Sequence, residues 1–290
     1  MTASHEESAG KNLYFIDHES GAEMARLLDQ DRLYTRGMGG FLSERSNDLT
    51  GFKHILDIGC GPGGWVQEIA FLYPEIEVEG IDISEQMIAY AQMQAKVQGL
   101  QNAHFRVMDM ARPLDFADQC FDLVNGRLIA FLPTTAWPGF MGECVRITRR
   151  GGIIRLTETE LSVTTSAALD HLDSLLKAGL RAAGQSFSPE GRHVGIIAMH
   201  AYFLQQAGCT NIGRKAHVLD YSAGTDYHQG FYDDWKVFFK LMQPFLIATQ
   251  VTTQEEVDRL YEQMLIDMMQ EDFCAVYLLV TTWGEKPTEP

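Results

Sequence analysis

The sequence lacks an apolar run long enough to cross a membrane, which takes about 18 residues. Its longest apolar run, 273–283, has the length of a strand and is interrupted by threonines. Residues 1–7 do not combine a basic region with an apolar one, so no signal peptide is expected. The five cysteines are far apart and form no C-x-x-C pair, which is typical of reduced thiols. These absences predict a cytoplasmic protein with no membrane partner.

Basic residues are also few, and the formal net charge is −16. A nucleic-acid partner is not expected, because phosphate backbones need a basic stripe. The nearest approach to one is Arg146, Arg149 and Arg150, which precede Gly151 and suit the C-terminal end of a helix. Motifs of metal hydrolysis, phosphoryl transfer and triad hydrolysis are absent too, and we expect no metal.

The most informative stretch present is 54–65, HILDIGCGPGGW, which reads as a strand, a glycine-rich turn and the start of a helix. Glycine lets the backbone approach a ligand closely, and the N–H groups of a helix start point toward it. Gly59, Gly61 and Gly64 fit the dinucleotide pattern G-x-G-x-x-G. However, a pyrophosphate would be repelled by the carboxylate of Asp57, whereas an ammonium or sulfonium would be attracted. A turn that serves packing alone is the alternative.

The first motif of the class I S-adenosylmethionine-dependent methyltransferases is an acidic residue followed by G-x-G-x-G, and four residues match it: Asp57, Gly59, Gly61 and Gly63. The chain resembles this family, with specific motifs only over 54–127. The resemblance implies S-adenosyl-L-methionine as the cofactor. It also implies a small-molecule acceptor of the kind methylated in bacterial secondary metabolism.

Strand and helix patterns alternate along the chain, which predicts a parallel sheet that binds ligands at the carboxyl ends of its strands. The polar residues at those ends are Asp57, Asp82, Asp109, Asn125, Glu158 and Glu160. Asp82 follows the glycines by about 20 residues, the spacing of an acid that binds ribose hydroxyls. An N-cap of the next helix is its alternative role.

The resemblance assigns more residues to the cofactor. Ile83 and Met87 would flank the adenine, Asp109 would bond its amino group, and Met110 would pack on the ring. For Ile83 and Met87 the alternative is core packing, and for Asp109 it is a turn.

Asn125 falls where the family holds the methionine part of the cofactor. Arg127 would meet the methionine carboxylate or an anionic acceptor, or would cap a helix. Helices ahead of the first motif often cover the cofactor in this family, which adds Tyr14, Met38 and Gly39 as contacts, with core packing as the alternative for the first two.

Transfer of a methyl group to oxygen, nitrogen or carbon can require a base. Glu158 and Glu160 face the same side of a strand by alternation, and burial would raise the pKa of either one. His193 and His200, in the helices that follow, are further candidate bases. The pair Arg192-His193 is an alternative binder of a diphosphate. Structural roles are the alternatives for all of these residues.

We expect an α/β fold: a Rossmann-like, doubly wound, mostly parallel seven-stranded sheet with an antiparallel last strand and an inserted helical cap. The predicted segments are 1–50, an N-terminal helical lid; 51–163, the cofactor-binding core; 164–208, the cap; and 209–290, the C-terminal part with helices along the acceptor pocket. The family places its last strand at the edge of the sheet.

Residues 220–271 are rich in aromatic residues and methionine, which predicts a bulky apolar acceptor. The function expected is methyl transfer to such a molecule, with C-methylation of a prenyl or terpenoid acceptor by a glutamate base as one form. O- or N-methylation of a natural product is an alternative. A non-catalytic S-adenosylmethionine-binding module and an NAD-dependent oxidoreductase are alternatives from other classes. A homo-oligomer is left open.

Overall fold

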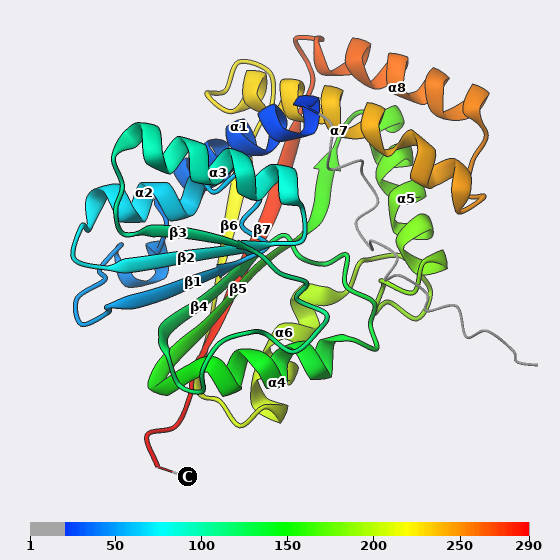
Figure 1. Cartoon of the computed structure of the whole chain (residues 1–290). Coiled ribbons are helices and arrows are strands. Elements are labelled where there is room, and N and C mark those ends of the chain that lie inside the picture. The colour runs from blue at the N-terminus through cyan, green and yellow to red at the C-terminus, as the bar shows by residue number, and fades with distance from the viewer. Residues whose placement is uncertain (1–20, 290) are drawn as a thin grey trace, which may run out of the picture.

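The computed structural model describes residues 21–289, in which seven strands form one sheet (Figure 1). The strands are β1 (His54–Ile58), β2 (Glu77–Asp82), β3 (Ala103–Val107), β4 (Phe121–Arg127), β5 (Thr148–Thr164), β6 (Thr210–Asp220) and β7 (Ala275–Glu285). Their order is β3-β2-β1-β4-β5-β7-β6. The first five pair in parallel, and β7 is antiparallel to both of its neighbours. The predicted fold class is confirmed.

The position expected for the last strand was wrong. β7 lies between β5 and β6, so that β6 forms the edge. The reason is composition: β7, AVYLLVTTWGE, is mostly apolar, whereas β6, TNIGRKAHVLD, carries more polar and charged residues, several of them exposed. The more apolar strand takes the interior position, where both faces are covered.

Eight helices surround the sheet in the described part of the chain. They are α1 (Gly21–Met38), α2 (Gly64–Leu72), α3 (Glu85–Gln98), α4 (Trp137–Ile147), α5 (Ala167–Ala182), α6 (Ile196–Gln206), α7 (His228–Ala248) and α8 (Gln254–Met268). α2 and α3 cover one face of the sheet, and α4 and α6 lie on the other (Figure 1). α1 packs on α7, and α5 packs on α7 and α8, beyond the carboxyl ends of the parallel strands. No helix of residues 21–289 is both long and apolar enough to span a membrane.

The stretch 164–208 does not form a single cap. α5 joins α7 and α8, but α6 packs against the sheet and against α4. The buried side of α6 explains this placement, since Phe203 stacks on Trp137 with ring centroids 5.6 Å apart. Arg149 and Arg150 also differ from expectation, because the helix ends at Ile147 and both arginines belong to β5.

Candidate active site

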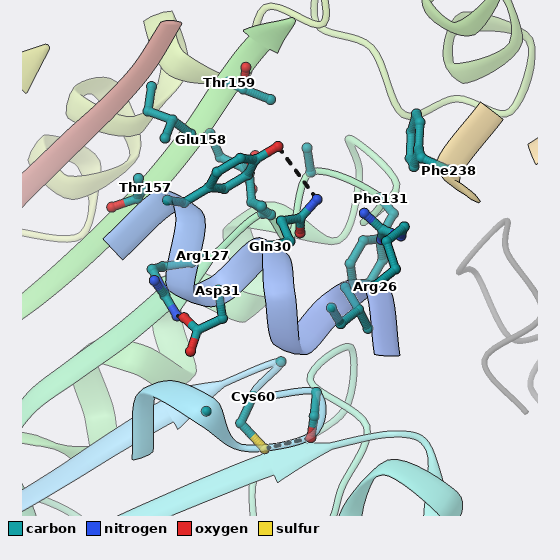
Figure 2. A pocket seen from close by; sticks show the side chains of 18 of the residues that line it. Arg26, Gln30, Asp31, Cys60, Arg127, Phe131, Thr157, Glu158, Thr159 and Phe238 are labelled. Atoms are coloured by element: carbon teal, nitrogen blue, oxygen red, sulfur yellow. Dashed lines mark hydrogen bonds and ion pairs between the residues drawn. The ribbon is translucent and has the colours of Figure 1, made fainter. Parts of the chain in front are cut away.

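A pocket opens at the carboxyl ends of the parallel strands, between the sheet and the helices beyond it (Figure 2). Its glycine-turn half is lined by Asp57, Gly59, Gly61, Asp82, Ile83, Met87, Met110 and Arg127. Its helical half is lined by Phe131, Leu161, Leu176, Leu180, Val194, Trp235, Phe238 and Tyr277, among others. Glu158 lines the same pocket from β5, flanked by Thr157 and Thr159 (Figure 2).

The glycine turn has the backbone that only glycine adopts easily. Gly59, Gly61 and Gly63 have φ values of +69°, +52° and +81°, in the left-handed region. Gly59 and Gly61 line the pocket. Gly63 is instead the N-cap of α2, and a Cβ there would lie 2.5 Å from the ring of Phe105. Two glycines therefore give access to the pocket, and the third allows the helix to pack on the sheet.

Asp57 is almost completely buried at the base of the pocket. Its Oδ1 accepts a hydrogen bond from Nδ2 of Asn125 at 2.7 Å. Burial raises the pKa of Asp57 to about 6, and the charge of Arg127 is the largest effect in the other direction. Asp57 is therefore mainly ionised at neutral pH. Asn125 does not line the pocket itself and acts from behind Asp57.

Asp82 connects the second strand to the glycine turn. Its Oδ2 accepts from the N–H of Gly61 at 3.0 Å, and its Oδ1 accepts from the N–H of Ser84 at 2.9 Å. The N-cap of α3 is Ser84, whose Oγ accepts from the N–H of Met87. Asp82 thus faces the pocket rather than capping the helix. Ile83 and Met87 line the pocket beside it.

Asp109 does not line the pocket. Its Oδ1 accepts from the N–H of Ala111 at 2.9 Å, and its Oδ2 lies 3.3 Å from Nε of Arg112, so it forms the turn that was its alternative role. The next residue, Met110, does line the pocket.

Of the three cofactor contacts expected near the N-terminus, the structure places one at the pocket. Gly39 does not line the pocket, whereas its neighbour Met38 does. Gly39 has a φ of +86° just after the end of α1 and serves that turn. Tyr14 lies outside the described residues.

Arg127 joins the sheet to α1. It forms an ion pair with Asp31, and its Nη1 donates to Oγ1 of Thr35 at 3.0 Å. Figure 2 shows the side chains of Arg127 and Asp31 pointing toward each other. The charge of Arg127 is thus already neutralised by a carboxylate at the wall of the pocket.

The two candidate glutamates have different surroundings. Glu158 is 1% exposed, and its Oε1 has no hydrogen-bond partner in the part of the chain that the structure describes. Burial raises the pKa of Glu158 to about 8. Glu160 instead accepts from the N–H groups of Val194 and Gly195, one on each oxygen, both at 2.8 Å. Glu158 thus lines the pocket with one oxygen unpartnered among the described residues, whereas both oxygens of Glu160 are occupied at the start of α6.

The histidines do not reach the pocket. His193 is exposed, and Arg192 beside it pairs with the exposed Glu190 at 2.8 Å. His200 is fully buried, 5.7 Å from the ring of Trp137, and burial lowers its pKa to about 3. None of these residues is placed to take a proton from a molecule in the pocket.

Sequence reasoning missed the polar face of α1. Arg26, Gln30 and Tyr34 line the pocket, and all three bond to Asp234 of α7. Nη1 of Arg26 lies 2.7 Å from its Oδ1, and the hydroxyl of Tyr34 lies 3.2 Å from its Oδ2. The four-residue spacing of these polar side chains, which puts them on one helix face, was the available signal.

An acidic glycine turn at the carboxyl end of the first strand, on a Rossmann-like sheet with an antiparallel last strand, defines the class I S-adenosylmethionine-dependent methyltransferase type of domain. Comparison with known proteins agrees: residues 55–152 match the family described as "Methyltransferase domain". The match is confined to this part of the chain, and the predicted resemblance and cofactor are confirmed.

Several relatives are similar to part of the chain. It is 38% identical over 128 residues to aklanonic acid methyltransferase DauC of Streptomyces sp. (strain C5), covering 41% of this chain and 54% of that protein. It is 32% identical to ajmaline N-methyltransferase of Rauvolfia serpentina, covering 50% of each. It is 33% identical to demethylmenaquinone methyltransferase of Geobacillus stearothermophilus, covering 37% of this chain and 45% of that protein. The chain thus matches about half the length of these relatives.

Solved structures share the fold over most of the chain. The YcgJ protein of Bacillus subtilis superposes with a TM-score of 0.53 at 15% identity, covering 87% of this chain and 98% of that one. Phosphoethanolamine N-methyltransferase 2 of Haemonchus contortus was solved in complex with phosphomonomethylethanolamine and S-adenosylhomocysteine. It superposes with a TM-score of 0.56 at 15% identity, covering 94% of this chain and 61% of that one. At these identities the likeness is one of fold.

Proposed function

We propose that the protein transfers a methyl group from S-adenosylmethionine to a largely apolar, uncharged small molecule, with Glu158 as the base. One observation carries the proposal: a single pocket joins the acidic glycine turn to an apolar helical half, and a buried glutamate on its wall, Glu158, has one carboxyl oxygen without a hydrogen-bond partner among the described residues. The cofactor, when bound, supplies an electrophilic methyl group on a sulfonium. The protein has to hold the two reactants in line and remove a proton.

The glycine-turn half fits this cofactor. Asp82 offers acceptors for ribose hydroxyls, and the ionised Asp57 suits an ammonium group. Ile83, Met87 and Met110 give apolar surface for the adenine. A Cβ on Gly59 would meet Ile129 at 2.9 Å and Met110 at 3.6 Å, so the turn leaves no room for a side chain where the ligand would approach.

The helical half supports an apolar acceptor, because aromatic and leucine side chains from α5, α7 and β7 form most of its wall. The two arginines that line the pocket are already paired with carboxylates and are not available to an anionic acceptor. Arg26 is paired with Glu23 and Asp234 at 2.7 Å each, and Arg127 is paired with Asp31. Among residues 21–289, the lining of the pocket therefore favours an acceptor without a diphosphate or carboxylate.

Glu158 supports a reaction in which the acceptor loses a proton. A carboxyl with a pKa of about 8 holds a proton more firmly than an ordinary glutamate, so its ionised form is a stronger base. C-methylation of an uncharged terpenoid or ring, where the proton leaves carbon, uses such a base. O-methylation of a hydroxyl uses it in the same way, and the position of the methyl group in the product distinguishes them.

Calorimetry and turnover test the proposal in sequence. The full chain is titrated with S-adenosylhomocysteine and, separately, with NAD⁺ and NADH; we expect heat only with the first. Methyl-labelled S-adenosylmethionine is then incubated with a panel of terpenoids, quinones, phenols and their carboxylated or phosphorylated analogues. Labelled product from the uncharged members is expected. Binding without product across the panel would favour a non-catalytic module, and binding of NAD alone would overturn the assignment.

A further inference from the structure

Four buried side chains form a line that ends at Asp57. Nε of Arg155 lies 2.5 Å from Oε1 of Glu44, and Nη1 of Arg155 donates to Oδ1 of Asn125 at 2.7 Å. Nδ2 of Asn125 then donates to Oδ1 of Asp57 at 2.7 Å. The side chains of Arg155 and Glu44 are 1% and 3% exposed. We call these four residues the Asp57 chain.

The sheet places three of them in one row. Asp57 of β1 is the register partner of Asn125 on β4, and Asn125 is the partner of Arg155 on β5. Residues opposite each other on adjacent strands lie on the same face. Glu44 reaches the end of the row from the short 3₁₀ helix Ser43–Arg45. Only Asp57 lines the pocket, so the other three act through it.

The Asp57 chain fixes which way the side-chain amide of Asn125 points. A guanidinium can only donate hydrogen bonds, so the oxygen of the amide must face Arg155. The NH₂ group is then left to donate to Asp57. A donor aimed at a carboxyl favours its ionised form, and Asp57 cannot rotate away without leaving the NH₂ group of Asn125 without this acceptor in the interior.

We infer that Arg155 and Glu44 are positioning residues that act through Asn125 to hold the Asp57 carboxylate ionised and aimed at the ammonium group of the cofactor. The inference rests on the proposed function for its ligand, but not for the charge state of Asp57. A buried ion pair is expensive to place in a core, and this one contacts the pocket only through that carboxylate.

Several charged groups act on the pKa of Asp57. Besides Asn125, Asp57 is influenced by Arg127 from β4, Asp31 from α1 and Arg155 from β5. Arg127 and Arg155 lower the pKa of Asp57, and Asp31 raises it. The thiol of Cys60 and the carboxylate of Asp82 lie on the adjoining turn and strand.

At the other end of the Asp57 chain, Arg155 and Glu44 have Lys215 and His217 of β6 as charged or titratable neighbours. Burial lowers the pKa of His217, and the charge of Arg155 acts on it in the same direction. Both effects disfavour the charged form of His217, and the charge on Arg155 is balanced mainly by Glu44.

The test follows two readouts on the full chain between pH 5 and 9: the affinity for S-adenosylhomocysteine by calorimetry, and the titration of Asp57 in the ligand-free protein by NMR with ¹³C-labelled aspartate carboxyls. In the unmodified protein both should change as the pH falls through about 6, where Asp57 takes up a proton. Arg155→Gln keeps an amide donor toward Asn125 but removes the charge. We expect both midpoints to move upward by about one pH unit, the size of effect that an opposite charge produces.

Two further variants make the result specific. Glu44→Gln removes the charge that balances Arg155, so both midpoints should move downward. Arg150→Gln makes the same charge change at an exposed position of the same strand and should follow the unmodified protein.

Unchanged midpoints in a folded Arg155→Gln protein would overturn the inference. If that variant does not fold, as judged by circular dichroism, an upward or absent shift in Glu44→Gln overturns it instead. Failure of the unmodified protein to bind S-adenosylhomocysteine would remove the proposed function, yet the NMR titration would still decide whether Arg155 sets the charge of Asp57.

Discussion

The two halves of the pocket are built in different ways. The glycine-turn half takes its residues from strand ends and the turns that follow them, all between Asp57 and Arg127. The helical half takes its residues from α1, β5, α5, α7 and β7, which are far apart in the sequence. The cofactor side is therefore encoded locally, in a segment that lies within the family match at 55–152, whereas the acceptor side exists only once the whole chain has folded.

The strongest way to separate the halves is Glu158→Gln. The amide has the shape of the carboxyl but cannot accept a proton, so turnover should fall about 100-fold or more, as for the loss of a general base. The affinity for S-adenosylhomocysteine should stay the same, because Glu158 is not part of the glycine turn. Kinetics with labelled cofactor and calorimetry measure the two effects, and full activity in the variant would contradict the role of Glu158.

The pH dependences of kcat and of cofactor affinity should separate the two halves of the pocket as well. Glu158 has a raised pKa of about 8 and must be ionised to act as a base, so kcat should fall as the pH drops below 8, approaching roughly tenfold per pH unit. Cofactor affinity should be lost only below about 6, through Asp57. A kcat that stays flat between pH 6 and 9 would exclude Glu158 as the base.

On the cofactor side, Asp82→Ala should weaken binding of S-adenosylhomocysteine by roughly tenfold or more, the scale of a lost charge-assisted hydrogen bond. Asp109→Ala is a matched control, because Asp109 lies just beyond the end of the neighbouring strand β3 and its carboxyl bonds within its own turn. Its affinity should match that of the unmodified protein. Equal losses in both variants would mean that the effect is structural.

On the acceptor side, Phe238→Ala should raise the KM for the acceptor by about fivefold, since it removes apolar surface from the pocket wall. Cofactor affinity should not change. Phe71→Ala, at a phenylalanine that is 69% exposed on α2, serves as the control. A loss of cofactor affinity in Phe238→Ala would show that the two halves are coupled.

The smallest effect is expected for Glu160→Gln. One amide oxygen can replace only one of the two acceptors used by Val194 and Gly195, and Val194 lines the pocket. KM for the acceptor should rise by about threefold, the order of one lost neutral hydrogen bond, with kcat unchanged. A fall in kcat as large as in Glu158→Gln would return Glu160 to the list of bases.

The sequence was informative where structure follows from short-range pattern. The strand, turn and helix around Asp57 are contiguous, and the position of Asp82 depends on a single strand–helix spacing. Glycines with positive φ at 59, 61 and 63 mark the turn because other residues adopt that backbone at a cost. These features predicted the sheet and the glycine-turn half together.

The rest depends on contacts that no local pattern contains. Alternation put Glu158 and Glu160 on one side of β5, but a bulge follows at Leu161, with a φ of +74°, and the chain returns to place Val194 and Gly195 against Glu160. The interior position of β7 likewise depends on competition between β6 and β7 for pairing with β5. Such outcomes are decided by the folded whole.

The place of β7 between β5 and β6 has a consequence for biosynthesis. Until residues 275–285 have left the ribosome, β5 has no partner on one side and β6 has none at all. Two long strands then wait with open backbone groups, the condition that invites intermolecular pairing. The nascent chain can complete the glycine turn early, but it can close its sheet only after residues 275–285 have emerged.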